Sequence, residues 1–198
     1  MSRQFDLSDE QRSIYEQSFN YARKELHPLL ARMDDEDWYP DHLMATLGAD
    51  GYCGLTAPQE LGGAGMDLFS AGLVAEAFGY WNLNAACIWG PHENLCLNNI
   101  LRNGNEEQVR RFIPPLCSGA KIGALGLTEP GAGSDALGSM RLAAVRDGDQ
   151  YVLNGRKMFI SNGPVADIVL VYAKTAPERG AKGISAFIVE TDTAGFSV

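Results

Sequence analysis

The chain has 198 residues, of which 45% are hydrophobic, and its formal net charge at pH 7 is -9. This length and apolar content suffice for one domain or two small ones with a buried core. The negative field repels phosphate backbones and anionic lipid, so we expect neither nucleic acid nor a membrane as a partner. Because no apolar run approaches the roughly 20 residues that span a bilayer and the first residues have no secretory or transit composition, a cytoplasmic protein is expected, or a mitochondrial matrix protein if a presequence was removed.

The cysteines and histidines form no pattern of metal ligands or disulfide partners. The cysteines contain no C-x-x-C pair and stand in apolar stretches, at Cys53, Cys87, Cys96 and Cys117. This usage is typical of reduced thiols in a core. The histidines are scattered as well, so we expect no metal site.

The first 120 residues have the pattern of a helical domain. Ser8 and Gln11 form a capping-box pattern, and an apolar helix face follows from Tyr15 to Leu29, where Pro28 is expected to help end the helix. Further helices are predicted over residues 41–47, 68–78 and 94–101, and from residue 105 to a stop at Pro114-Pro115. Residues 1–120 are therefore expected to be an all-α domain.

After Lys121 the composition changes to short β-favouring runs. These runs are residues 141–145, 151–153, 157–160, 168–173 and 184–189. Between several of them lie dipeptides that supply positive φ in tight turns, namely Asp147-Gly148, Asn154-Gly155 and Asn162-Gly163. We predict a mostly antiparallel β-domain over residues 121–198, joined to the helices near residues 118–119, and hence an α+β chain.

The segment LGLTEPGAGSD, residues 125–135, is the strongest candidate for a binding loop. Small residues and two hydroxyls after a strand can bring backbone N–H groups close to an anion or a polar ring. No lysine follows as in a phosphate-binding P-loop, and no βαβ unit surrounds it as in a dinucleotide fold. By itself the segment fits a plain interdomain turn equally well. Glu129, followed by Pro130, is interpreted as an acceptor that organises the turn, not as a catalytic group.

Four separated blocks resemble the acyl-CoA dehydrogenase family. They are FDLSDEQ at 5–11, LTAPQELGGAG at 55–65, TEPGAGSD at 128–135 and LNGRKMFISNG at 153–163. The resemblance covers essentially the whole chain. It is greatest to short branched-chain members such as isovaleryl-CoA dehydrogenase, through GPHENLC at 90–96, RNGNE at 102–106 and residues 162–175.

The resemblance implies an FAD site in the second domain. Leu125, Leu127 and Thr128 would lie along the isoalloxazine, the last two at its pyrimidine edge. Gly133 and Ser134 would lie near the FAD pyrophosphate, and Ser134 also near the acyl-CoA chain. Donors at these positions would stabilise the charge of a reduced ring.

A second segment implied by the resemblance covers the flavin. Phe159, Ile160 and Ser161 match its aromatic, aliphatic and hydroxyl positions, and the Ser161 hydroxyl would reach flavin N5 where many members have Thr. From the residues alone, Phe159 and Ile160 fit the core of a strand at least as well. Ala181 and Lys182 match positions that border CoA, although a solvated loop lysine is the commoner interpretation.

The reaction implied is FAD-dependent α,β-dehydrogenation of an acyl-CoA thioester such as isovaleryl-CoA. A glutamate removes the α-proton, the β-hydrogen leaves as hydride to flavin N5, and an electron-transfer flavoprotein receives the electrons. The family implies a homotetramer. Since its glutamate comes from a C-terminal helical domain, we expect no catalytic residue here, an incomplete β-domain and no C-terminal helical bundle. The alternatives are an acyl-CoA oxidase or flavin monooxygenase on the same scaffold, and a truncated, non-catalytic binding module.

Overall fold

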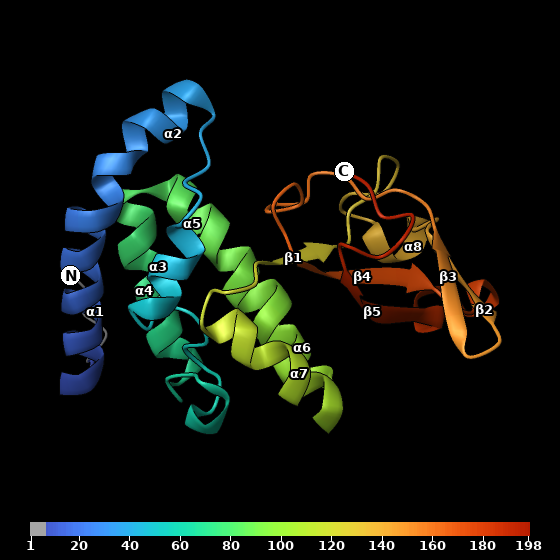
Figure 1. The fold of residues 1–198 in the computed structure, drawn as a ribbon, viewed down its shortest axis with the longest axis horizontal. Helices are drawn as coiled ribbons and strands as arrows, with labels where there is room; N and C mark the ends of the chain where they lie inside the picture. The colour runs from blue at the N-terminus through green and yellow to red at the C-terminus, as the bar shows by residue number, and fades with distance from the viewer. Residues whose placement is uncertain (1–6) are drawn as a thin grey trace, which may run out of the picture. The chain divides into compact units, whose positions relative to one another are not determined.

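The computed structural model describes residues 7–198 and divides into two compact units (Figure 1). The first unit ends at Ala120 and is helical, and the second begins at Lys121 and contains a five-stranded sheet. A helical domain followed by a sheet domain confirms the predicted α+β class. Among residues 7–198, no helix is long and apolar enough to cross a membrane.

The first unit consists of short helical segments that follow one another closely. They are α1 (Asp9–Tyr21), the π turn η1 (Ala22–Leu26), the 3₁₀ turn η2 (His27–Leu29), α2 (Leu30–Glu36), α3 (Leu43–Ala49), the 3₁₀ turn η3 (Gln59–Leu61), α4 (Leu68–Trp81), α5 (Leu83–Gly90), the π turn η4 (Pro91–Leu97), α6 (Asn98–Asn103) and α7 (Glu106–Cys117). In Figure 1, α5, η4 and α6 form one continuous helical run.

Side-chain caps set where several of these helices begin. Ser8 and Gln11 make the predicted capping box, each accepting from the other's backbone N–H at 3.1 Å. Asn82 separates α4 from α5, and its buried side chain accepts from the Ala85 N–H at 2.9 Å and donates to the Leu26 carbonyl at 2.7 Å. These caps satisfy backbone groups that a helix end leaves without partners.

Two helix ends predicted from proline were wrong. Pro28 lies inside the 3₁₀ turn η2, and the chain continues directly into α2. Pro114 and Pro115 lie inside α7, which ends only at Cys117. The carbonyls that lose their donors belong to exposed Arg110 and Arg111, where water can replace the missing bonds. Continuing the helix also buries Leu116 and Cys117.

The start of α7 supports a quantitative prediction. Asn105 accepts from the Gln108 N–H at 2.9 Å, and the Gln108 side chain accepts from the Asn105 N–H at 2.9 Å. Asn105→Ala should lower the free energy of unfolding by about 1 kcal/mol, because it removes the side-chain oxygen that accepts from the Gln108 N–H. Urea denaturation measures the loss. Asn105→Ser keeps the cap and should stay within a few tenths of a kcal/mol of the wild type; equal losses in both variants would contradict the prediction.

The second unit is built on a mixed sheet. Its elements are β1 (Gly123–Gly126), α8 (Ala136–Ser139), β2 (Ala143–Asp147), β3 (Gln150–Asn154), β4 (Ile168–Lys174), the 3₁₀ turn η5 (Pro177–Gly183) and β5 (Ile184–Glu190). The central strand β4 pairs in parallel with β1 and, at one residue pair, with β2, and it pairs antiparallel with β5. The β2–β3 pair is also antiparallel.

The turn dipeptides had different outcomes. Asp147-Gly148 forms the predicted hairpin, because Asp147 pairs with Gln150 and Gly148 has φ of 60°. Asn154-Gly155 ends β3 without leading into a neighbouring strand, and residues 157–160, predicted as a strand, have no regular structure. The unit's core lies along β4, and it consists of Ala124, Leu142, Ala144, Ala166, Val169, Val171 and Ala173.

Candidate functional site

The candidate loop begins where β1 ends, next to the central strand. Leu125 of β1 pairs with Leu170 of β4. Past Leu127 and Thr128 the chain folds back, and Glu129 and Ala132 exchange two backbone hydrogen bonds of 3.0 Å. The tight turn exposes Gly131 and Gly133, and a Cβ on either would meet nothing within 4 Å. The loop therefore presents open backbone beside a rigid strand.

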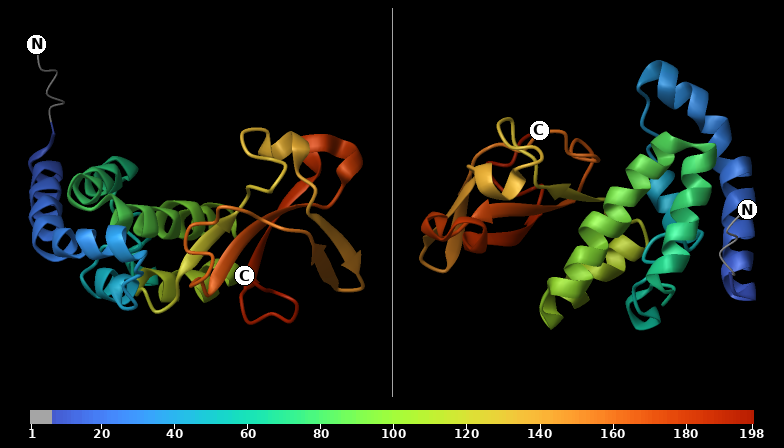
Figure 2. Two further views of the ribbon diagram at one scale, coloured as in Figure 1. Left: turned by 90° about the horizontal axis from the view of Figure 1, so that it is seen from above. Right: turned by 180° about the vertical axis from the view of Figure 1, so that it is seen from behind.

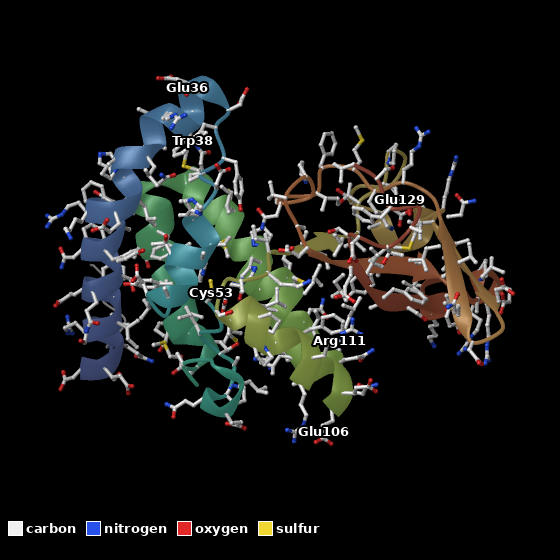
Figure 3. All side chains as sticks on the ribbon, in the orientation of Figure 1. Glu36, Trp38, Cys53, Glu106, Arg111 and Glu129 are labelled. Carbon is white, nitrogen blue, oxygen red and sulfur yellow. The ribbon has the colours of Figure 1, made fainter. Side chains whose placement is uncertain are left out.

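Glu129 anchors this loop to two other segments. Its side chain is buried (the residue is 6% exposed) and accepts from the Arg141 N–H at 2.6 Å, the Leu142 N–H at 2.9 Å and the Lys157 ammonium at 2.9 Å. Burial opposes the charge, but the hydrogen bonds from Lys157 and the two amides outweigh it and lower the pKa of Glu129. Glu129, which Figure 3 labels within the second unit, thus serves as an acceptor that organises the chain.

The loop and the segment 157–161 are brought together directly. The Lys157 ammonium donates to the Leu127 carbonyl at 3.1 Å as well as to Glu129. One residue later, the Met158 N–H donates to the Thr128 carbonyl at 2.8 Å. Two segments some 30 positions apart in sequence therefore lie side by side.

Phe159 and Ile160 have different environments. Phe159 is 85% exposed and has φ of 56°, in the left-handed region that a bulky residue rarely adopts. It is therefore not a core residue of a strand. Ile160 packs against the core cluster of the sheet, whereas Ser161 is exposed. Non-glycine residues held in such a backbone conformation cluster at active sites and ligand-binding segments.

The remaining site candidates lie around α8. Ser134 is exposed and is separated from the start of α8 by one residue. The turn η5, which contains the exposed Ala181 and Lys182, packs against α8. Figure 2 (left) shows α8 and η5 side by side at one end of the sheet. Ala181 and Lys182 are thus connected to the loop through α8.

Lys157 and Met158 were not among the residues singled out from the sequence. Both lie inside the block that resembles the family, but nothing local pairs Lys157 with a carboxylate 28 positions earlier. A buried carboxylate that stays ionised is usually paired with a cation, so the one signal available was a carboxylate in a turn between glycines. That signal does not identify the cation that pairs with the carboxylate.

The thiols do not form a site. Cys53, Cys96 and Cys117 are buried, as predicted, but Cys87 is exposed, so its assignment to the core was wrong. Burial raises the pKa of Cys117 to about 12 and suppresses its thiolate. Within residues 7–198, no three His, Cys, Asp or Glu side chains gather as metal ligands.

A second buried carboxylate lies in the helical unit. Glu93 is 1% exposed and accepts from the Gly54 N–H at 2.6 Å and the Leu55 N–H at 2.7 Å. Burial outweighs these donors and raises the pKa of Glu93 to about 7. The adjacent His92 is fully buried and donates to the Leu116 carbonyl at 3.0 Å. Its burial lowers the pKa of His92 to about 4.

These neighbours should give opposite pH dependences of stability. Glu93 binds its proton more tightly when folded, so its contribution is present below an unfolded pKa of about 4.3 and is lost as the pH rises towards 7. His92 binds its proton less tightly when folded, so its contribution is present above about 6.5 and is lost as the pH falls towards 4. Between about pH 4.5 and 6.5 the two nearly cancel.

Single substitutions should reveal each contribution. Relative to wild type, His92→Gln should lose stability with rising pH by about 1.4 kcal/mol per unit, and Glu93→Gln should gain it at a similar rate. Urea unfolding at several pH values between about 4.5 and 6.5 gives both slopes. Slopes of the same sign in the two variants would contradict this assignment.

Comparisons with known proteins match both units. The family profile described as "Acyl-CoA dehydrogenase, N-terminal domain" matches residues 8–120, and the profile for the middle domain matches residues 124–198. An acyl-CoA dehydrogenase of Bacillus subtilis (strain 168) is 44% identical over 179 residues, which cover 90% of this chain and 47% of that protein. The mitochondrial isovaleryl-CoA dehydrogenase of Pongo abelii is 40% identical over 195 residues, 96% of this chain and 46% of that protein.

A solved structure shows the same similarity in three dimensions. It is a glutaryl-CoA dehydrogenase from Mycobacterium smegmatis in complex with FADH2, with a TM-score of 0.89 and 34% identity. The match covers 96% of this chain and 48% of that one. The chain thus spans about half the length of the relatives it matches.

Proposed function

Because the chain belongs to the acyl-CoA dehydrogenase family, we propose that its second unit contributes the flavin-facing surface of an FAD-dependent enzyme that dehydrogenates an acyl-CoA thioester between Cα and Cβ. The observation that carries the proposal is the exposed, strained Phe159, which the Met158–Thr128 hydrogen bond holds beside the loop after β1. An apolar ring next to open backbone and hydroxyl groups suits a flat, partly polar ring system.

The residues present fit this cofactor. Leu125, Leu127 and Thr128 would line one edge of the flavin, and the exposed hydroxyl of Ser161 would donate to the ring from the neighbouring segment. Phe159 would cover the ring and exclude water, with Ile160 fixing the segment on the sheet core. When bound, FAD supplies the acceptor for the hydride that leaves the substrate.

The phosphate-bearing parts of both ligands would meet the loop and α8. Gly133 and Ser134 would face the FAD pyrophosphate, since a Cβ at Gly133 would meet nothing within 4 Å and Ser134 is exposed. Ser134, Ala181 and Lys182 would border the acyl-CoA, and the exposed ammonium of Lys182 suits a phosphate in a chain whose net charge repels anions. No residue of this chain is proposed as the base. Glu129 is excluded from that role because Lys157 and two amides already occupy its carboxylate.

The substrate proposed is a short branched acyl-CoA such as isovaleryl-CoA. This choice follows the family resemblance and the name of the relative from Pongo abelii. For the complete enzyme, we propose a homotetramer that passes its electrons to an electron-transfer flavoprotein, in the cytoplasm or in a mitochondrial matrix. The two domains proposed for this segment are residues 1–120 and 121–198.

Visible absorption of the purified chain with added FAD tests the proposal. We expect the flavin bands to shift and sharpen on binding, and to bleach when isovaleryl-CoA is added anaerobically to a complete active site. Phe159→Ala should weaken FAD binding about two- to tenfold, because a well-placed aromatic contact is worth about 0.5–1.5 kcal/mol. Phe69→Ala, which removes another exposed phenylalanine, is the matched control. Equal FAD affinity of the chain and of Phe159→Ala would contradict the assignment of this surface.

A further inference from the structure

Lys157 connects both halves of the candidate flavin surface. Its ammonium is 2.9 Å from the Glu129 carboxylate and 3.1 Å from the Leu127 carbonyl, and the next residue donates its N–H to the Thr128 carbonyl at 2.8 Å. The pair is almost fully removed from water, with side-chain exposures of 9% for Lys157 and 5% for Glu129. Three consecutive residues of the loop are thereby bonded to two consecutive residues of the other segment.

Stability alone does not account for a charge at this place. Burying an ion pair costs desolvation energy that its attraction often fails to recover, and well-packed apolar residues commonly do as well or better. A lysine does what an apolar residue cannot, because it donates to a carboxylate and a backbone carbonyl at once. The second of these bonds, to the Leu127 carbonyl, is the one that an apolar residue would lose.

The peptide group of that carbonyl joins Leu127 to Thr128. Its carbonyl accepts from the Lys157 ammonium, and its N–H belongs to Thr128. A hydrogen bond from a cation polarises a peptide group, so that its N–H becomes a stronger donor, and the effect is larger where water is excluded. Thr128 is the residue placed at the pyrimidine edge of the ring under the proposed function.

We propose that Lys157 is a positioning residue of the flavin site, which sets the register between the loop 127–129 and the segment 158–161 and polarises the Leu127–Thr128 peptide. The identity of the ligand rests on the proposed function, whereas the register does not. Polarisation favours negative charge beside the Thr128 N–H. Reduction places such charge on the pyrimidine side of a flavin, so Lys157 should favour binding of reduced over oxidised FAD.

Amide hydrogen exchange without any flavin tests the register. In Glu129→Gln/Lys157→Met, which leaves no charge buried and therefore loses less overall stability than the single variant, exchange of the Met158 amide should be at least tenfold faster relative to the Leu170 amide of β4, which reports opening of the sheet itself. Lys157→Arg, which keeps the cation, should restore protection. Lys121→Met is the matched control, because Lys121 lies in the same unit and pairs at 3.8 Å with a partly exposed Glu190. Equal acceleration of the Met158 and Leu170 amides in Glu129→Gln/Lys157→Met would overturn the positioning role.

Binding of the two flavin redox states tests the polarisation. For Lys157→Met we expect the affinity for reduced FAD to fall about tenfold more than the affinity for oxidised FAD, which equals a drop of about 30 mV in the two-electron potential. Lys157→Arg should show the wild-type ratio. An equal loss for both redox states would overturn the polarisation. A wild-type chain that binds neither form would contradict the proposed function instead, and the exchange result would then decide the register by itself.

Discussion

Lys157→Met should lower the free energy of unfolding of the second unit by about 3–5 kcal/mol, because it leaves the buried Glu129 carboxylate without its cation. The two backbone donors that remain, from Arg141 and Leu142, stabilise the charge only in part. Chemical denaturation followed by circular dichroism in the far and near ultraviolet measures the loss. Lys121→Met removes a partly exposed pair and should cost no more than about 1 kcal/mol.

Removing both charges should cost much less than the sum of the single losses. In Glu129→Gln/Lys157→Met no charge stays buried, and the Gln oxygen can still accept one of the two backbone N–H groups. We expect the double variant to be at least about 2 kcal/mol more stable than additivity predicts. Additive losses would mean that the ion pair has no energetic coupling, and would contradict the geometry described for it.

Protonation of Glu129 at low pH should destabilise the fold, as the loss of the ion pair does. The folded pKa of Glu129 is lowered, so its contribution to stability is present above the unfolded pKa of about 4.3 and is lost as the pH falls through the folded value. In Glu129→Gln this part of the acid destabilisation should disappear, which a denaturation series below about pH 5 would show.

Gly119→Ala should be strongly destabilising, whereas Gly51→Ala should be mild. Both glycines have positive φ, 67° and 79°, so alanine costs roughly 1–2 kcal/mol of backbone energy at either position. A Cβ at Gly119 would overlap the Met44 carbonyl, whereas a Cβ at Gly51 would meet nothing within 4 Å. The overlap should add about 1–3 kcal/mol or more, because neither backbone can move without disturbing α3 or the end of α7.

Thermal and urea denaturation of the two variants give this comparison directly. Each variant is the control for the other, since both carry the same change at a left-handed glycine. A loss at Gly51 as large as the loss at Gly119 would show that backbone conformation, and not crowding, limits both positions.

The sequence by itself determined the elements whose signals are local. The capping box at Ser8, the helix start near Asn105 and the hairpin at Asp147-Gly148 depend on residues within four positions of each other, so the sequence predicts them directly. The change from helical to strand periodicity was equally readable and indicated a helical part followed by a sheet. The family resemblance pointed to the loop after residue 125 and to residues 159–161 as parts of one site.

Only the tertiary structure decided how those parts meet. Pro114 and Pro115 remain inside a helix because burying its last turn outweighs two lost hydrogen bonds. The β-favouring run 157–160 forms no strand, because Met158 bonds to the Thr128 carbonyl and Phe159 turns out into solvent. Lys157 meets Glu129 across 28 positions of sequence. Contacts of this kind depend on which surfaces the fold brings together, and no local pattern of residues contains that information.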